Sequence, residues 1–369
     1  MAYITAIKSS ILVFPLIAFL FTTPFILYNY HKYGSINPLK TLIVYSFILY
    51  MITIYFLVIL PLPKIEEVIV KPNMVRLIPF GFIKDIIQET SFVLNNPNTY
   101  LKALTEPCFY TVIFNVFMTI PFGMYLRYYF KCDLKKTVFY SFLLSLFFEL
   151  TQITGLYFIY PHPYRVFDVD DLLTNTLGGL IGYVFMGVID NYLPTREEID
   201  RSAIRKGREV SGLRRITLFF LDFFLFIFFS LLVSLFLRNY HPFLIIFLFY
   251  YIGIPLIKKG STLGGSFLNV RLEYKNAKVL RSFFRIVFLF IYYFLTPFWI
   301  LIGTYLLVNH LGMNTTITIY FYLATLAVII LFYFINGLIL IAKKETFYDK
   351  LLKVNYVSTI KEEEENETD

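Results

Sequence analysis

Long runs of apolar residues, separated by short polar segments, dominate the pattern of this chain. A helix needs about 20 residues to cross the hydrocarbon core of a bilayer, and nine runs approach or exceed that length. The pattern therefore predicts an all-α fold, a polytopic integral membrane protein with about nine transmembrane helices. The expected spans are Ser10–Tyr28, Thr41–Leu62, Cys108–Leu126, Thr137–Tyr160, Leu172–Tyr192, Ile216–Leu237, Pro242–Ile257, Ile286–Val308 and Ile317–Ile341.

One longer polar segment, Leu193–Gly212, divides these spans into two groups. It is rich in charged residues and contains two glycines, which is typical of a connection between domains. The end of the chain is an acidic run. We therefore predict a first transmembrane bundle at 1–192, a cytoplasmic linker at 193–213, a second bundle at 214–357 and a disordered acidic tail at 358–369.

The composition excludes an ordinary soluble protein. The chain is 58% hydrophobic and only 16% charged, whereas soluble domains are about 45–50% apolar and about 25% charged. With so few charges to cover a core, the chain needs the lipid bilayer as its outer solvent. The net charge of +8 does not indicate nucleic acid, because the basic residues lie between apolar runs and form no patch with base-stacking motifs.

The basic residues also predict an orientation. Most of the 33 Lys and Arg residues fall in alternate loops, with the largest groups at 196–215 and 258–285. Such loops face the cytoplasm, so we expect a multi-pass protein of the cell membrane with its N-terminus outside and its C-terminus in the cytoplasm. The 63–104 loop differs, because acidic residues balance its basic ones. Its apolar part, Val75–Ile83, either lies in the membrane interface or re-enters the membrane.

Polar residues first interrupt the apolar spans between 149 and 175. Ionisable groups inside a membrane are costly, so they face a bundle interior and are candidates for function. Asp168, Asp171 and Asn175 are spaced by three and four residues, which places them on one helix face. The candidate polar cluster, at the expected external mouth of the first bundle, comprises Glu149, Gln152, Arg165, Asp168, Asp171 and Asn175.

Two interpretations of this cluster stay open. As a functional site, it would hold a cation, relay a proton or bind a polar headgroup beside Arg165. As a structural feature, it would consist of helix capping by Asp168 or Asp170 and a buried hydrogen bond between Glu149 and Asn175. No Cys/His ligand set indicates zinc, and a hard cation would need more oxygen ligands. We therefore expect no metal and no cofactor.

A face of small residues follows the cluster. Gly178 and Gly182 are four residues apart, with Gly179 beside them. Small residues at this spacing let another helix approach closely. The neighbour would be another helix of the same bundle or a second copy of the chain in a homo-oligomer.

A second set of polar residues lies at the ends of the sixth and ninth spans. It consists of Arg214, Arg215, Asp222 and Asp349. Arg215 and Asp222 are two helical turns apart and share one face. A structural ion pair and a proton or cation path through Asp222 would both explain the set.

No arrangement of residues predicts a catalytic site. The glycine-rich stretch Gly260–Asn269 lacks the Lys of a P-loop, and no Gly-x-Ser-x-Gly motif is present. We expect a protein that is not an enzyme.

These motifs give the first bundle a resemblance to the VanZ-like family, over roughly residues 40–190. The first span is then an extra helix ahead of the family core. The resemblance implies a membrane protein that lowers susceptibility to glycopeptide antibiotics such as teicoplanin. It rests on Arg76-Leu-Ile-Pro-Phe80, Ile120-Pro-Phe-Gly123, Glu149 with Gln152, Asp168-x-Asp-Asp171 and Asn175-x-x-Gly-Gly179, in this order.

The second bundle resembles the RDD family, which is named for an arginine and two aspartates. Arg214 or Arg215, Asp222 and Asp349 match these positions, and Gly260–Gly264 is similar to the family's internal glycine segment. The basic residue that usually follows that segment is replaced here by Gly265 and Ser266. The resemblance implies ion exchange for some members.

Three functions follow, in order of preference. The first is a non-enzymatic protein of the cell envelope that alters the access of glycopeptides, or of lipid-linked cell-wall precursors, at the outer leaflet. The second is a cation/proton exchanger or small-solute transporter. The third is a membrane enzyme that acts on a lipid headgroup.

Overall fold

The computed structural model describes residues 2–69, 72–93, 95–236, 243–342 and 346–360, and most of them are helical. Within these residues, seven helical segments are long and apolar enough to cross a membrane, which confirms the predicted all-α, polytopic fold class. These segments are Ile4–Tyr33, Pro38–Ile59, Pro107–Tyr128, Val169–Tyr192, Gly212–Phe236, Lys278–His310 and Thr315–Ile341.

The two remaining predicted spans are also helical but differ from the seven. α6 (Leu134–Ile153) has 20 residues and carries several polar side chains. The apolar helix Phe243–Ile257 is shorter than the others and comprises α11 (Phe243–Leu248), the π-helix η4 (Phe249–Gly253) and α12 (Ile254–Ile257). Pro242, where this span was expected to begin, lies outside the described residues.

The chain divides into two compact units, 1–22 with 38–199 and 23–37 with 200–369. These units do not coincide with the predicted segments, because the end of the first helix belongs to the second unit. The segment expected to be a linker contains a helix, α9 (Arg196–Gly207). Its Ala203 is fully buried and accepts a hydrogen bond from the Ser35 hydroxyl at 2.6 Å. This polar segment therefore packs against the residues that follow α1.

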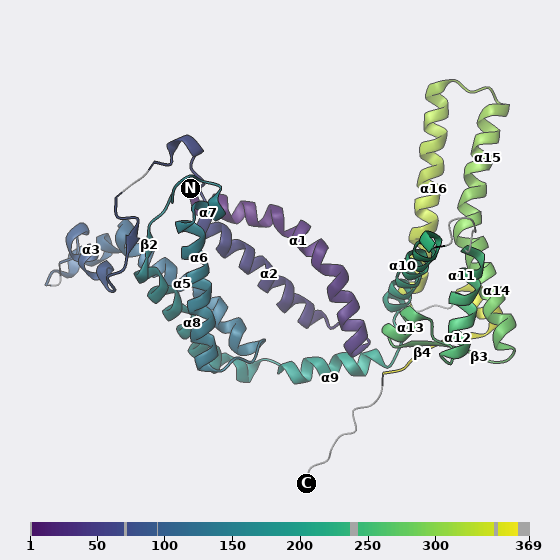
Figure 1. Cartoon of the computed structure of the whole chain (residues 1–369), viewed down its shortest axis with the longest axis horizontal. Coiled ribbons are helices and arrows are strands. Elements are labelled where there is room, and N and C mark those ends of the chain that lie inside the picture. The colour runs from purple at the N-terminus through teal and green to yellow at the C-terminus, as the bar shows by residue number, and fades with distance from the viewer. Residues whose placement is uncertain (1, 70–71, 94, 237–242, 343–345, 361–369) are drawn as a thin grey trace, which may run out of the picture. The chain divides into compact units, whose positions relative to one another are not determined.

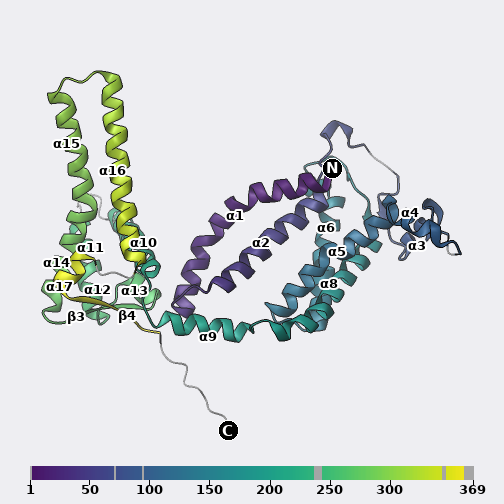
Figure 2. The same ribbon diagram turned by 180° about the vertical axis from the view of Figure 1, so that it is seen from behind.

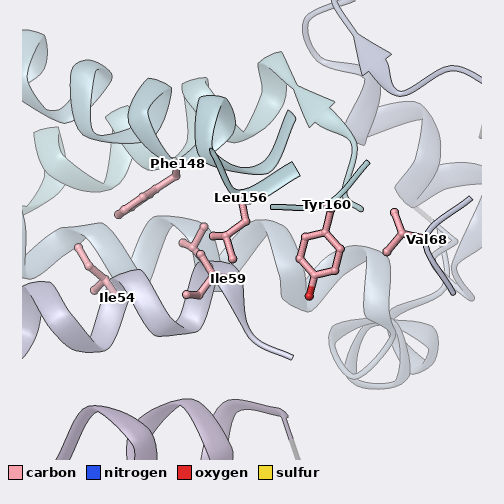
Figure 3. Packing of buried hydrophobic residues seen from close by; sticks show 7 residues of the cluster. Ile54, Ile59, Val68, Phe148, Leu156 and Tyr160 are labelled. Atoms are coloured by element: carbon pink, nitrogen blue, oxygen red, sulfur yellow. The ribbon is translucent and has the colours of Figure 1, made fainter. Parts of the chain in front are cut away.

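The first unit is a helical bundle (Figures 1 and 2). Its long helices are the first part of α1 (Ala2–Tyr33), α2 (Pro38–Ile59), α5 (Pro107–Tyr128), α6 and α8 (Val169–Ile189), which the 3₁₀ helix η3 (Asp190–Tyr192) follows. One apolar core joins α2 and α6 to the short α7 (Gly155–Phe158). Figure 3 shows this core, in which Ile54 and Ile59 of α2 lie near Phe148 and Leu156.

A stripe of polar side chains on α6 points inward, whereas most of its aromatic side chains, Phe148 excepted, are exposed. The polar residues are spaced by three or four, so they form one stripe, and all are buried. Phe139, Phe142 and Phe147 are exposed on the opposite side. A helix in water would show the reverse pattern, and lipid is the solvent that suits an outer aromatic face. The buried stripe consists of Thr137, Ser141, Ser145, Glu149 and Gln152.

Glycines bring α8 close to α5 and α6. A Cβ atom at Gly178 would overlap Thr119 and the Val116 carbonyl of α5, and one at Gly179 would overlap Ser141 of α6. A Cβ atom at Gly182 would overlap the carbonyl of Ile120. The small-residue face thus lies at helix contacts inside this unit.

The 63–104 loop contains short elements that sequence patterns did not predict. Its strand β1 (Val75–Arg76) pairs in parallel with β2 (Phe167–Asp168), which leads directly into α8. This pairing joins the loop to the start of α8. The other elements are η1 (Ile65–Glu67), α3 (Gly81–Glu89), η2 (Pro97–Thr99) and α4 (Tyr100–Leu104).

The second unit combines long helices with one small antiparallel sheet. Strands β3 (Val270–Tyr274) and β4 (Val354–Ser358) pair so that Val270 lies opposite Ser358. Figure 2 shows this sheet at the opposite end of the unit from the turn between α15 and α16. The helices are α10 (Gly212–Phe236), α11, η4 and α12, α13 (Leu263–Phe267), α14 (Lys278–Phe290), η5 (Ile291–Leu295), α15 (Thr296–His310), α16 (Thr315–Ile341) and α17 (Phe347–Leu352).

The predicted acidic tail lies outside the described residues from position 361 onward. The residues before it are ordered, since β4 continues to Ser358. A core of Tyr30, Val210, Leu218, Leu268 and Val270 holds the sheet end of this unit together.

A pair of glycine-to-alanine substitutions tests the helix contact. Gly179→Ala is expected to destabilise the protein by about 1–3 kcal/mol, because the new methyl group overpacks against Ser141. Gly303→Ala in α15 is the control, because no atom lies within 4 Å of its added Cβ. There the gain in helix propensity is worth about 0.5–1 kcal/mol. Thermal unfolding in detergent measures both, and equal shifts would contradict the close contact.

Candidate functional site

The start of α8 carries three aspartates, Asp168, Asp170 and Asp171, and each accepts a hydrogen bond. Asp168 is the N-cap of α8, where its carboxylate accepts the backbone N–H of Asp170 at 2.9 Å. Such a cap satisfies one of the free N–H groups at a helix start. Burial raises the pKa of the Asp168 carboxyl above its ordinary value. The capping interpretation therefore holds for Asp168, on its own helix.

Asp170 instead caps a different helix, 90 residues earlier in the chain. Its two carboxylate oxygens accept the backbone N–H groups of Phe80 at 2.6 Å and Phe82 at 2.8 Å. Phe80 precedes α3 in a left-handed conformation, with φ of 63°, which turns the chain into the helix. Asp170 is buried. It thus fixes the 63–104 loop to the start of α8.

Glu149 and Gln152 attach α6 to its neighbours. The Glu149 carboxylate is 2% exposed and accepts the backbone N–H of Asp168 at 3.0 Å. The Gln152 amide donates to the Val58 carbonyl at the end of α2, at 3.1 Å. The two side chains therefore share the inner face of α6, as predicted from their spacing, but bind different elements.

Asp171 and Asn175 face α5 and α6. The Asp171 carboxylate accepts the Asn115 amide of α5 at 2.6 Å. The Asn175 amide donates to Ser145 of α6 at 2.9 Å, and its Oδ1 is buried without a partner. The expected bond between Glu149 and Asn175 is therefore not formed, because each of these side chains lies nearer to another partner.

Two arginines balance part of this negative charge. Arg165 donates to the Leu60 carbonyl at 2.8 Å and lies within electrostatic range of Glu149 and Asp171. Arg76 lies 3.1 Å from Asp85 and 3.9 Å from Asp168. The loop, α6 and α8 thus contribute charged groups to one region, which we call the mouth cluster. Its members are Arg76, Asn115, Glu149, Arg165, Asp168, Asp170 and Asp171.

Chemically, the mouth cluster is a hydrogen-bonded network of carboxylates. Among the described residues, no three His, Cys, Asp or Glu side chains form a group that could hold a metal ion. The acids are bound by backbone N–H groups, by an amide and by nearby guanidinium groups.

Four residues of this region, Arg76, Asn115, Ser145 and Asp170, were not in the predicted polar cluster, although Arg76 and Asp170 belong to the motifs of the family resemblance. Asn115 has a sequence signal, since a lone Asn lies within an apolar span. Ser145 also lies on the polar stripe of α6. Asp170 adjoins predicted residues, but its partner in a distant loop gives no local signal.

In the second unit, the Arg214 side chain is fully buried and joins several segments through hydrogen bonds. Its guanidinium donates to the carbonyls of Gly207 at 2.8 Å, Leu268 at 2.8 Å and Asn269 at 2.7 Å. It also donates to the Ser358 hydroxyl at 3.3 Å. Arg214 therefore ties the end of α9 to the residues before β3 and to the last residue of β4.

Asp222 binds the glycine-rich segment, and among the described residues it forms no ion pair with an arginine. It accepts the Tyr250 hydroxyl at 2.8 Å, the Thr262 hydroxyl at 2.7 Å and the Gly264 N–H at 3.0 Å. A Cβ atom at Gly264 would approach the Asp222 carboxylate, so glycine is required there. The expected basic partner is replaced by neutral donors in the described part of the chain.

Asp349 forms a buried ion pair. Arg285, which the sequence did not indicate, donates to it at 2.8 Å, and Thr346 donates at 2.8 Å. Arg215 instead stacks its guanidinium over the Tyr356 ring at 4.4 Å. Arg214, Asp222 and Asp349 thus have separate sets of partners.

Comparison with known proteins identifies part of the chain. Residues 47–190 match the family model VanZ/LLP1. This VanZ-like segment contains α5, α6 and α8, together with the whole mouth cluster. No curated protein and no solved structure matches the chain. No RDD match was found, so that resemblance stays a prediction.

Asp170→Ala tests the attachment of the loop. A hydrogen bond to a charged group contributes about 1.5–3 kcal/mol, so amide exchange at Phe80 and Phe82 is expected to accelerate by at least about tenfold. Hydrogen–deuterium exchange of the protein in detergent measures this. Asp133→Ala is the control, because Asp133 caps the N-terminal end of α6 and does not bind Phe80 or Phe82. Unchanged exchange at Phe80 and Phe82 in Asp170→Ala would refute the contact.

Proposed function

We propose that this protein is a non-enzymatic membrane protein of VanZ type that lowers susceptibility to teicoplanin-type glycopeptides. It would act at the outer leaflet of the cell membrane, on the access of the antibiotic or of lipid-linked cell-wall precursors. The observation that supports this proposal is the convergence of separate motifs. The loop motif at Arg76–Phe80, Glu149 of α6 and the acidic start of α8 bind one another.

The exposure and charge of the two arginines in the mouth cluster suit the binding of a ligand. Arg76 keeps 58% of its side chain exposed while it lies beside two carboxylates. Arg165 lies near the buried Glu149 and the half-buried Asp171. A pair of arginines held in this way suits an anionic or hydrogen-bonding headgroup, because guanidinium groups bind such groups with several donors. The acids hold the arginines in position.

Expression in a glycopeptide-susceptible Gram-positive host tests the proposal. The chain is expected to raise the minimum inhibitory concentration of teicoplanin several-fold. Asp171→Asn should abolish this increase, because the charge beside Arg165 and Asn115 is lost. Asp133→Asn removes an exposed carboxylate outside the cluster and should keep the increase. Immunoblots of membranes confirm equal amounts. No increase for any glycopeptide with the unchanged chain would refute the proposal.

Cation/proton exchange is the second candidate, and one observation favours it. Asp222 is 5% exposed, and among the described residues no basic side chain forms an ion pair with it. A buried carboxylate without a cation can take up a proton or bind a small cation.

Reconstituted vesicles test this second function. With a pH-sensitive dye inside, the chain should acidify or alkalinise the lumen under a sodium or potassium gradient, and Asp222→Asn should stop this flux. Asp133→Asn is again the control for loss of one carboxylate. Flux equal to that of empty vesicles would exclude exchange.

A further inference from the structure

A basic cleft lies at the sheet end of the second unit. The mouth cluster belongs to the first unit, so the two share no residues. The cleft has a volume of about 320 Å³, within the range of small-ligand sites, which runs from about 300 to 1,000 Å³. The end of β3, the start of β4 and helix α17 form it. The lining residues are Glu273, Tyr274, Lys275, Asp349, Lys350, Lys353, Val354 and Asn355.

The charges of this cleft do not cancel. Glu273 is paired with Arg271, and Asp349 is paired with Arg285 at 2.8 Å, so both acids of the lining are already neutralised. Three lysines remain: Lys275, Lys350 and Lys353. Within the described residues, none of them forms an ion pair. The cleft therefore carries an uncompensated positive charge.

The backbone at Lys353 is a second, independent observation. Lys353 ends α17 in the left-handed region, with φ of 52°. Glycine is the usual residue at this position of a helix end, because a side chain there costs free energy. Lys353 therefore lines the cleft from a backbone position that suits glycine.

The position of the cleft indicates the class of ligand. Residues 258–285 and the segment after α16 are rich in Lys and Arg, which we expect on the cytoplasmic side of the membrane. Short basic segments next to membrane spans attract anionic lipid headgroups. Ammonium groups on flexible stems are also common ligands of phosphate. From this geometry we infer that the cleft of Lys275, Lys350 and Lys353 binds a phosphate group, carried by an anionic phospholipid or by a soluble phosphate compound.

Binding measured on the full chain in a non-ionic detergent tests this inference. Thermophoresis titrations use three probes: short-chain phosphatidylglycerol, short-chain phosphatidylcholine and inorganic pyrophosphate. Phosphatidylcholine has a phosphate but no net charge, so it reports the contribution of the lipid body. Tight binding of phosphatidylglycerol alone would identify a lipid as the source of the phosphate. Tight binding of pyrophosphate alone would identify a soluble compound, and both outcomes support the site.

Lys353→Gly separates binding from folding. It removes the ammonium group and relieves the left-handed strain, so the unfolding temperature should stay equal or rise. The dissociation constant of the bound anion should rise about tenfold, as expected for the loss of one charged contact. Lys258→Gln is the matched control, because it removes one lysine of the same basic loop outside the cleft.

Two results would overturn the inference. One is that neither phosphatidylglycerol nor pyrophosphate binds more tightly than phosphatidylcholine. The other is that Lys258→Gln weakens binding as much as Lys353→Gly, which would mean general attraction to a basic surface.

Discussion

Hydrocarbon offers no hydrogen-bond partner, and the rest of this structure depends on that constraint. Every polar group within a span must find its partner inside the protein. In α6, the polar stripe therefore faces the bundle interior, and Phe139, Phe142 and Phe147 are exposed. In α10, the same constraint turns Asp222 toward Tyr250 and Thr262. The polar clusters therefore lie where most of their groups find partners inside the protein.

The two units meet this constraint with different groups. In the first, carboxylates accept backbone N–H groups, and Asp170 thereby holds a loop from 90 residues away. In the second, the Arg214 guanidinium donates to the carbonyls of Gly207 at the end of α9 and of Leu268 and Asn269, which precede β3. The first unit thus uses buried acids to bind backbone N–H groups, and the second also uses a buried cation to bind backbone carbonyls. Loss of either would leave several backbone groups without partners.

Hydropathy predicted the long helices, and the spacing of Glu149 with Gln152 predicted that both lie on the inner face of α6. Asp168 was expected on one helix face with Asp171, but it lies in β2 and caps α8 in an extended conformation, so only Asp171 belongs to the helix. The partners could not be predicted, because they come from distant segments: Asp170 binds Phe82, and Asp349 binds Arg285. A short parallel pair such as β1 and β2 also leaves no periodic signal, since each strand has two residues.

The most direct test of the account is the orientation of α6 in a bilayer. Spin labels placed one at a time at Phe139, Ser141, Phe142, Ser145 and Phe147 report collisions with dissolved oxygen, which concentrates in lipid. The account predicts high collision rates at the three phenylalanine positions and low rates with immobilised spectra at Ser141 and Ser145. High rates at the serine positions, or equal rates at all five, would contradict it.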